Sequence, residues 1–364
     1  MLIKYSARLV LKVCSYLLYF LTLLTAYGGY INPEWWTLPS MGVLFFPYFA
    51  MVTLLVAAVW LILRRWIVGS VGIGVLMLCG PTFSAALPFH FSSTADDPAN
   101  TFKLVTFNTL HLQDLRNPGA DWNRSLHFLT YCGADFICCQ ELYGFERPEL
   151  KQKYQSQIDS LRAVYPYRTE DKRREVEFLS KYPFERVPIK LKDDLQYPNL
   201  GAYRVHIKGR ELTIINVHLS SYMLSEAERQ IITEATNSAG LKNSIRELEG
   251  SVYKKMGEAF KHRAKLSEAV ADFAAGIEGN VIICGDFNDV PGSWAYRKFT
   301  KAGFDDAYAQ TGFGHLITYN SHLMYFHIDQ ILFKGAMVPL YVRKVRMNAS
   351  DHYPLEAEFE FIAP

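Results

Sequence analysis

The chain has 364 residues, half of them hydrophobic, and a formal net charge of +2 at pH 7. Five of the 38 basic residues and one of the 36 acidic residues lie in the first 90 positions, which leaves 33 basic and 35 acidic residues after them. This slightly acidic remainder is unlike a dedicated nonspecific DNA-binding protein, which tends to be basic, and it is large enough to bury a single core.

Three apolar stretches, at 9–30, 41–63 and 66–88, fill most of the first quarter of the chain. Each is near the ~20 residues that a helix needs to cross a bilayer, and we therefore expect three transmembrane helices. A cleavable signal peptide is the alternative for the first stretch. The two stretches that follow favour a membrane anchor.

Basic residues mark one end of these stretches. Lys4, Arg8 and Lys12 stand at the start of the first, and two arginines at 64–65 separate the second from the third, whereas 31–40 has no basic residue. The positive-inside rule then puts the N-terminus in the cytoplasm. With three spans, the rest of the chain faces the other side. We expect an integral membrane protein, of a bacterial inner membrane, with its main domain extracytoplasmic.

The sequence divides into an anchor at 1–90, a short polar linker at 91–100 and a main domain at 101–364. Membrane lipids are the expected partners of the anchor. No protein partner is predicted.

Two strand-like segments early in the main domain end in polar side chains. The alternating run at 104–109 contains Asn108, whose amide can bind a hard cation or position a carboxylate, although a lone Asn there is usually a turn residue. The apolar run at 135–142 contains Glu141. A carboxylate at the end of such a run needs a partner, and a divalent cation is one that would serve.

A third run, at 212–221, places His218 at its end, before two serines. By itself this histidine is more often a packed, hydrogen-bonded residue than a catalyst. Before the helical pattern at 259–273 comes a longer insertion at 223–257, which we expect to border the site and restrict the substrate.

The most informative segment is 281–291, a β-branched run followed by Asp286, Asn288 and then Pro-Gly. Side chains two residues apart on a strand point the same way. The carboxylate can therefore hold a water while the amide orients a phosphoryl oxygen. An isolated pair of this kind is usually part of a turn.

Two last motifs follow, in the runs 327–333 and 350–355. Asp329 lies in the first, and Asp351 and His352 lie in the second. The strand carboxylate could orient and charge the imidazole that arrives from the next loop.

In this order the motifs resemble the endonuclease/exonuclease/phosphatase family, with its deoxyribonuclease-I-like fold. The residues that carry the resemblance are Asn108, 140–141, 216–218, 285–288, 328–329 and 350–352. The resemblance covers 101–362. It implies an α/β fold, a four-layer sandwich of two packed, mostly antiparallel β-sheets flanked by helices, with the active site at one end.

The resemblance also implies hydrolysis of phosphate esters with a divalent cation, usually Mg²⁺, which Mn²⁺ can replace. By this resemblance Asn108 and Glu141 would hold the metal, with Asp351 as a further ligand. Asp286 would orient or deprotonate the attacking water, and Asn288 would stabilise the transition state.

The resemblance assigns the remaining polar groups to the phosphate. His352, paired with Asp329, would bind or protonate it, and His218 would make a second contact or act as general acid. Either Glu175 or Glu177 could support His218, and the sequence leaves that choice open.

The predicted function is therefore that of a membrane-anchored, metal-dependent phosphodiesterase of nuclease type, acting on nucleic acid or on a lipid headgroup. One alternative is a sphingomyelinase-like phospholipid phosphodiesterase or phosphatase, which membrane proximity favours. An alternative from another class is an inactive, membrane-tethered binding module.

Overall fold

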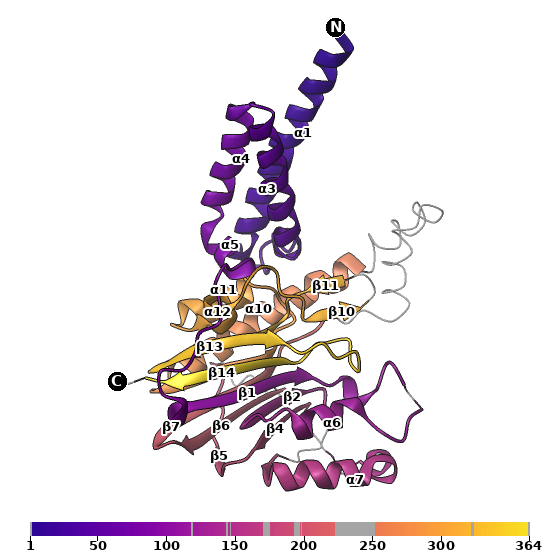
Figure 1. Cartoon of the computed structure of the whole chain (residues 1–364), viewed down its shortest axis with the longest axis vertical. Helices are drawn as coiled ribbons and strands as arrows, with labels where there is room; N and C mark the ends of the chain where they lie inside the picture. Colours follow the sequence, from indigo (N-terminus) through magenta and orange to yellow (C-terminus); the bar gives the residue numbers. More distant parts are fainter. Residues whose placement is uncertain are drawn as a thin grey trace.

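A helical bundle stands on a sandwich of two β-sheets in the computed structural model of the chain (Figure 1). The structure describes residues 2–117, 119–142, 145, 147–169, 175–192, 197, 199–222, 252–321 and 324–362. Most of the insertion predicted at 223–257 lies outside the described residues. Its last part, 252–257, contains the first residues of helix α10 (Tyr253–Ala275).

The two large sheets have six strands each, in the orders β13-β14-β1-β2-β4-β3 and β5-β6-β7-β8-β12-β9. The first contains β1 (Thr101–Asn108), β2 (Phe136–Gln140), β3 (Tyr167–Arg168), β4 (Val176–Ser180), β13 (Met337–Lys344) and β14 (Leu355–Phe361). The second contains β5 (Phe184–Arg186), β6 (Leu200–Ile207), β7 (Arg210–His218), β8 (Asn280–Asp286), β9 (Asp305–Asp306) and β12 (Asp329–Lys334). A separate hairpin is formed by β10 (Tyr319–Ser321) and β11 (Met324–Phe326).

Apolar side chains from both sheets form the central core. Phe136 and Phe178 of the first sheet belong to one buried cluster with Ile214 and Ile282 of the second. On the outer faces, α6 (Arg124–Tyr131) and α7 (Pro148–Val164) pack on the first sheet, and α10 and α11 (Trp294–Lys301) pack on the second. The predicted α/β two-sheet sandwich with flanking helices is confirmed.

Two parallel strand pairs in otherwise antiparallel sheets bring polar strand ends together. Asn108 on β1 pairs with Gln140 on β2, and His218 on β7 pairs with Asp286 on β8, which also pairs with Asp329 on β12. Gly285 has a φ of 144°, and a Cβ there would lie 1.9 Å from the carbonyl oxygen of Val217. A glycine is therefore required where β8 carries its aspartate to the edge.

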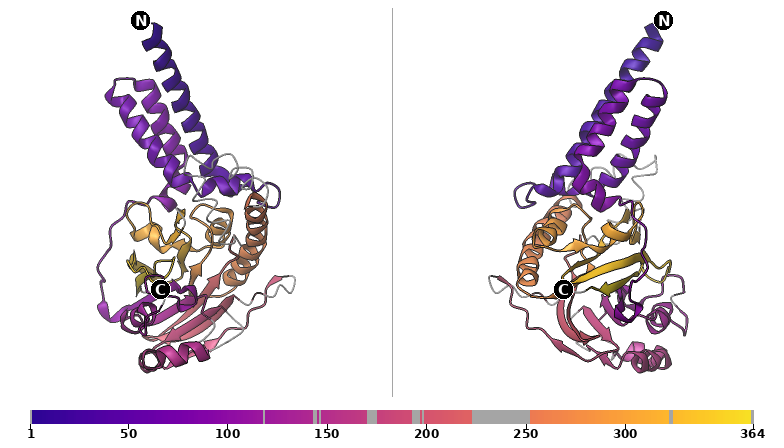
Figure 2. Two further views of the ribbon diagram at one scale, coloured as in Figure 1. Left: turned by 90° about the vertical axis from the view of Figure 1, so that its right-hand side faces the viewer. Right: turned by 60° about the vertical axis from the view of Figure 1, so that its left-hand side comes forward.

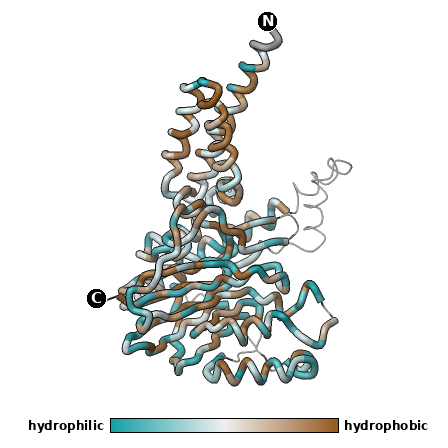
Figure 3. The backbone as a smooth tube through the Cα atoms, viewed as in Figure 1, coloured by the Kyte–Doolittle hydropathy of each residue, from teal (hydrophilic) through white to brown (hydrophobic). Residues whose placement is uncertain are grey.

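The N-terminal part is a bundle of apolar helices, α1 (Leu2–Tyr27), α3 (Phe46–Ile62), α4 (Trp66–Leu78) and the short α5 (Gly80–Ala86). Figure 3 shows this part as mainly hydrophobic, with hydrophilic stretches at the end far from the sheets. The short α2 (Leu38–Val43) and η1 (Gly28–Tyr30) lie between α1 and α3. Inside the bundle, the indole of Trp60 donates to Ser15 Oγ over 2.8 Å.

The expectation of three membrane-spanning helices is wrong. Among the described helices, only α1, over Ser6–Tyr30, is by itself long and apolar enough to cross a membrane. The span predicted at 41–63 corresponds to α3, which has 17 residues and is about 25 Å long. It is shorter than the hydrocarbon core of a bilayer, which is ~30 Å thick. It is short because a turn at Leu44–Phe45, followed by Pro47, separates it from α2.

The prediction at 66–88 gave two helices, α4 and α5, which meet at an angle of 76° and pass the length test only as one broken span. Pro81 in the first turn of α5 explains the break, because proline cannot donate to the preceding turn and its ring clashes with it. A helix like α1 near the N-terminus is either a membrane span or a signal sequence.

The end of the bundle lies against the sandwich in both views of Figure 2, and close contacts join the two parts. A Cβ on Gly29 of η1 would lie 1.9 Å from the carbonyl oxygen of Gly292, so the two backbones touch. Arg297 on α11 donates to Gly292 O over 2.9 Å and to Thr82 Oγ1 over 2.7 Å, and its guanidinium lies 3.7 Å from the ring centre of Tyr30. These contacts fix the end of the bundle on the domain.

Candidate active site

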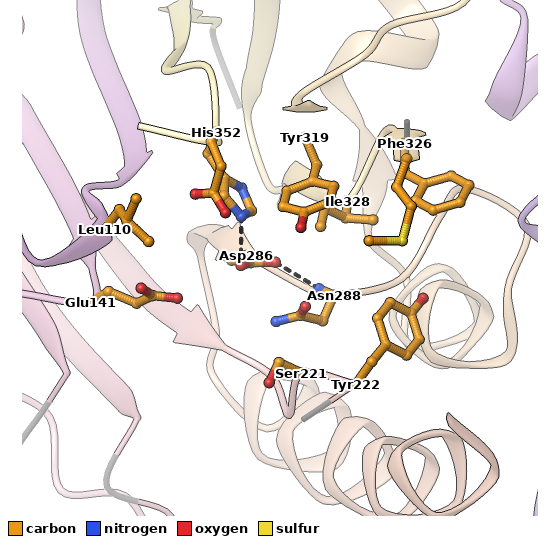
Figure 4. Close-up of a pocket in the computed structure, with 12 residues that line it drawn as sticks. Leu110, Glu141, Ser221, Tyr222, Asp286, Asn288, Tyr319, Phe326, Ile328 and His352 are labelled. Atoms are coloured by element: carbon orange, nitrogen blue, oxygen red, sulfur yellow. Dashed lines mark hydrogen bonds and ion pairs between the residues drawn. The ribbon is translucent and has the colours of Figure 1, made fainter. Parts of the chain in front are cut away.

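The polar strand ends surround one pocket of about 120 Å³. Figure 4 shows Asp286 and Asn288 at its centre, Glu141 on one side, and Tyr222 and Phe326 on the other. The lining residues are Leu110, Glu141, Ser221, Tyr222, Asp286, Asn288, Tyr319, Met324, Phe326, Ile328, Asp351 and His352. The pocket thus has an acidic side and an aromatic side.

The acidic side is built around the amide of Asn108. Its Nδ2 donates to Glu141 Oε1 and to Asp286 Oδ2, each over 3.0 Å, while its Oδ1 accepts from the backbone N–H of Leu110 over 3.1 Å. Glu141 directly follows β2 and has a φ of 53°. This left-handed backbone is strained for a glutamate, and such strain is concentrated at functional sites.

His218 lies beside both carboxylates. Its Nε2 is 3.7 Å from Asp286 Oδ2 and 3.9 Å from Glu141 Oε1, and its Nδ1 is 3.2 Å from Glu175 Oε2. Burial opposes the charged imidazole, but the contact with Glu175 and the charges of Asp286 and Glu141 outweigh it, so the pKa of His218 is raised. Glu177 is buried elsewhere and accepts from Thr169. Of the two candidates left open, Glu175 therefore supports His218.

His352 forms the second charged pair. Its Nδ1 is 2.9 Å from Asp329 Oδ2, and its Nε2 is 3.6 Å from Asp286 Oδ2. Burial again opposes charge, but the charges of Asp329 and Asp286 together hold the pKa of His352 well above its usual value. The charged form of the imidazole that faces the pocket is therefore favoured.

Asp286 is the group that all these side chains share, and it is buried. Its Oδ1 accepts from the backbone N–H of Asn288 over 2.8 Å. Burial raises the pKa of Asp286, the neighbouring charge of Asp329 adds to the effect, and His352 and His218 oppose it. A carboxylate with a raised pKa is a stronger base than an exposed one.

Every predicted site residue lies in or directly behind this pocket. Glu141, Asp286, Asn288, Asp351 and His352 line it. Asn108, His218 and Asp329 stand behind them and contact lining residues. Asn288 donates its amide to Leu219 O over 2.8 Å and has a φ of 49°, and Asp351 accepts from Ser350 Oγ over 3.3 Å.

The donor set fits a hard divalent cation. Glu141 and Asp286 approach one amide from two strands, which leaves two carboxylates facing one small space, and oxygen ligands of this kind are those that Mg²⁺ prefers. A second grouping, Asp286, Asp329 and His352, also has ligand atoms within 4.8 Å of one another in the described chain. Asp329 is already the partner of His352, however, so we favour a position at Glu141, beside Asp286.

Sequence reasoning missed Arg263. It is buried, donates to Ser220 O over 2.9 Å, lies 3.4 Å from Asp289 Oδ2 and stacks 4.7 Å from the ring centre of Tyr222. It thereby ties the ends of two site loops to α10. The signal was present, because Arg263 follows Phe260 by three residues on the buried stripe of that helix.

Sequence reasoning also missed the aromatic side of the pocket. Tyr319, Met324 and Phe326 come from the β10–β11 hairpin, and Ile328 follows it. Their sequence has the appearance of an ordinary strand pair, and only the fold places it against the site.

A family model described as "Endonuclease/Exonuclease/phosphatase family" matches residues 105–352, and one described as a domain of unknown function matches residues 8–85. None of the curated proteins compared with the chain matches it.

Solved structures are similar at low identity. An endonuclease/exonuclease/phosphatase from Beutenbergia cavernae is 13% identical with a TM-score of 0.47, and the match covers 72% of each chain. A 3'-5' exonuclease from Neisseria meningitidis is 17% identical with a TM-score of 0.44, covering 72% of this chain and 100% of its own. Beta toxin from Staphylococcus aureus is 16% identical with a TM-score of 0.42, covering 70% of this chain and 99% of its own.

Proposed function

The chain belongs to the endonuclease/exonuclease/phosphatase family, and on that premise we propose that it is a membrane-anchored hydrolase of phosphodiesters that uses Mg²⁺ or Mn²⁺. One observation carries the proposal: Glu141 and Asp286 share the amide of Asn108 in a pocket that two histidine–carboxylate pairs also enter. Negative, positive and hydrogen-bonding groups are then all within reach of one phosphate.

The cation would be held by Glu141 and Asn108, with Asp351 as a further ligand. When bound, it neutralises charge on a nonbridging phosphate oxygen and on the leaving group. In this structure the Asn108 amide presents its nitrogen to the carboxylates, and its oxygen would have to rotate from the Leu110 N–H to act as a ligand.

Asp286 orients the attacking water and accepts its proton, which the raised pKa of this carboxylate favours. The water oxygen bonds to phosphorus, the bond from phosphorus to the leaving oxygen breaks, and the leaving oxygen takes up a proton. His218 and His352 are the available donors and phosphate contacts, because each is charged by its own carboxylate. Asn288 contributes a further hydrogen bond to the transition state.

We place the bundle in a bilayer, with α1 crossing it. The outer surface of the bundle exposes large apolar side chains, which is unfavourable in water. Leu55 is 65% exposed and Ile67 is 77% exposed. Arg8 and Lys12 of α1 line a hollow at the end far from the domain. The positive-inside rule then puts that end in the cytoplasm and the pocket on the opposite side.

The proposal is tested by hydrolysis with the full-length protein in detergent. After EDTA treatment, we expect no cleavage of a soluble aryl phosphodiester, recovery with Mg²⁺, and loss of that recovery in Asp286→Ala. A folded protein that binds Mg²⁺ but cleaves no phosphodiester would contradict the proposal and favour the inactive binding module.

Nucleic acid is a candidate substrate on one observation. A hollow of about 660 Å³ is lined by Arg116, Arg124, Lys344 and Arg346, and also by Tyr353, the neighbour of His352. A basic surface beside the site suits a polyphosphate backbone. If nucleic acid is the substrate, plasmid nicking will fall in Arg346→Ala, while hydrolysis of the soluble ester will not.

A further inference from the structure

An apolar groove lies at the end of the bundle that contacts the domain. This groove, which we call the α1–α2 groove, has a volume of about 670 Å³ and is lined by residues that include Leu24, Tyr27, Trp36, Leu38, Met41 and Phe45. Its lining comes from the last turns of α1 and from the segment that contains α2. An exposed apolar hollow of this size indicates a binding site.

The groove lies next to the aromatic side of the pocket. The ring centre of Phe45 lies 6.1 Å from that of Phe326, which lines the pocket. Met41 of the groove and Met324 of the pocket pack against one buried cluster, which contains Leu44. One layer of side chains therefore separates the groove from the aromatic side of the pocket.

The surroundings of the groove are those of a bilayer interface. The neighbouring α1 exposes apolar residues, with Leu17 and Phe20 each 56% exposed. Trp35 is 84% exposed and Trp36 is 55% exposed beside the groove. Tryptophans are enriched where hydrocarbon meets headgroups, so the groove lies at the membrane surface nearest the pocket.

The two sides of the pocket suit the two ends of one molecule. A phosphate would contact His352 and a cation held at Glu141, whereas Met324 and Phe326 offer only apolar and aromatic surface. The buried cluster that contains Phe326 also packs against Met41 of the groove. A soluble ester would leave the groove unused.

We propose that the substrate is a membrane phospholipid, held with an acyl chain in the α1–α2 groove and its phosphodiester at Asp286. This inference rests on the proposed function and specifies its substrate class. Water adds to phosphorus and one ester P–O bond breaks, giving a phosphomonoester and an alcohol, of which one keeps the acyl chains. The bundle then acts as part of the substrate site as well as an anchor.

Two glycines allow a matched test. A Cβ on Gly42, which lines the groove, would lie 3.6 Å from Thr25 Cγ2, an ordinary contact, so Gly42→Trp fills the groove without a backbone clash. A Cβ on Gly74 of α4 would have no described neighbour within 4 Å, so Gly74→Trp adds the same side chain elsewhere on the bundle.

The full-length protein, wild type and both variants, is reconstituted in phosphatidylglycerol vesicles with Mg²⁺, and release of diacylglycerol or phosphatidate is measured. The same samples are assayed with a soluble aryl phosphodiester and with plasmid. We expect Gly42→Trp to slow lipid hydrolysis by at least about tenfold and soluble-ester hydrolysis by less than about twofold, with no change in Gly74→Trp.

The outcomes separate this inference from the proposed function. If the wild type cleaves no ester, the proposed function fails. If it cleaves the soluble ester or plasmid but no lipid, or if Gly42→Trp cleaves lipid as fast as Gly74→Trp, the function stands and the lipid inference is overturned.

A second measurement applies if Gly42→Trp also slows the soluble ester through misfolding. A phospholipid with a photoreactive acyl chain is crosslinked to the wild type, and the adducts are mapped. Adducts in 21–45 support the groove as the acyl site. Adducts confined to other surfaces of α3 and α4 overturn it.

Discussion

The main domain and the bundle place their apolar side chains in opposite ways. In the domain, Phe136, Ile214 and Ile282 are fully buried between the sheets. In the bundle, Ile62 is 79% exposed and Ile67 is 77% exposed. The domain thus buries its central apolar side chains between its own sheets, whereas the bundle presents a surface that requires apolar surroundings.

The contrast extends to the site. The acidic side of the pocket is made within the domain, from strand ends fixed by sheet register. The aromatic side belongs to a cluster that also contains Val43 and Leu44 from the bundle. Chemistry should therefore depend on the domain alone, and the binding of apolar groups should depend on both parts.

The largest expected effect is on chemistry. Asp286→Ala should lower the hydrolysis rate by about 10²–10⁴-fold, because it removes the proposed base, while membrane association stays unchanged. The rate is measured on the soluble ester under saturating Mg²⁺. Asp272→Ala, an exposed change on α10, is the control and should keep full activity. Equal losses of hydrolysis rate in the two variants would show that the pocket does not carry out the reaction.

The support of His218 gives the next effect. Glu175→Gln removes the charge 3.2 Å from Nδ1, so the imidazole is less well oriented and less readily charged. We expect kcat to fall by about 10–100-fold, as for other groups that orient a functional histidine. Glu185→Gln on the exposed part of β5 is the matched control. An unchanged kcat in Glu175→Gln would show that His218 has no catalytic role.

A third prediction concerns the contact between the two parts. Gly29→Leu inserts a side chain where even a Cβ would lie 1.9 Å from Gly292 O, which should cost about 1–3 kcal/mol of folding free energy. The thermal midpoint of the domain should then fall by about 2–10 °C. Gly74→Leu, in open space, should not change it. The same midpoint in both variants would show that the bundle and the domain do not stabilise each other.

The last effect is on stability in acid, and near neutral pH it is absent. Burial, with smaller contributions from the nearby charges of His315 and Lys344, lowers the pKa of His327 to about 3. Its unfolded pKa is about 6.5, so the unfolded chain takes up a proton first as the pH falls. His327 should then remove up to about 1.4 kcal/mol of stability per pH unit between pH 6.5 and pH 3.

Urea unfolding of the protein at a series of pH values measures this slope. His327→Phe keeps an aromatic ring beside Tyr308 and should flatten the slope. His206→Phe, at a side chain that is 74% exposed, should not. A slope that persists in His327→Phe would assign acid sensitivity to other groups.

Much of the site was predictable because its residues end strands. Asp286, Glu141 and His218 each come at the end of an apolar run, and period and composition mark such runs in a sequence. The two-sheet sandwich followed from the family motifs.

Other features depended on tertiary placement. The aromatic side of the pocket and the role of Arg263 come from elements distant in sequence, and no local pattern links Phe326 to Asp286. Too many membrane spans were predicted for the anchor, because hydropathy counts apolar residues and does not detect the helix breaks at Pro47 and Pro81. The remaining choice between Glu175 and Glu177 depended on where β4 begins, because Glu175 precedes this strand and Glu177 is buried within it.

The most direct test of the account is calorimetric titration of Mg²⁺ into the full-length protein, with Glu141→Gln and Asp329→Asn beside the wild type. We predict that Glu141→Gln weakens binding by at least about tenfold and that Asp329→Asn changes it much less, because Asp329 serves His352. Unchanged binding in Glu141→Gln with loss in Asp329→Asn would contradict the account. It would place the ion at Asp286, Asp329 and His352 instead.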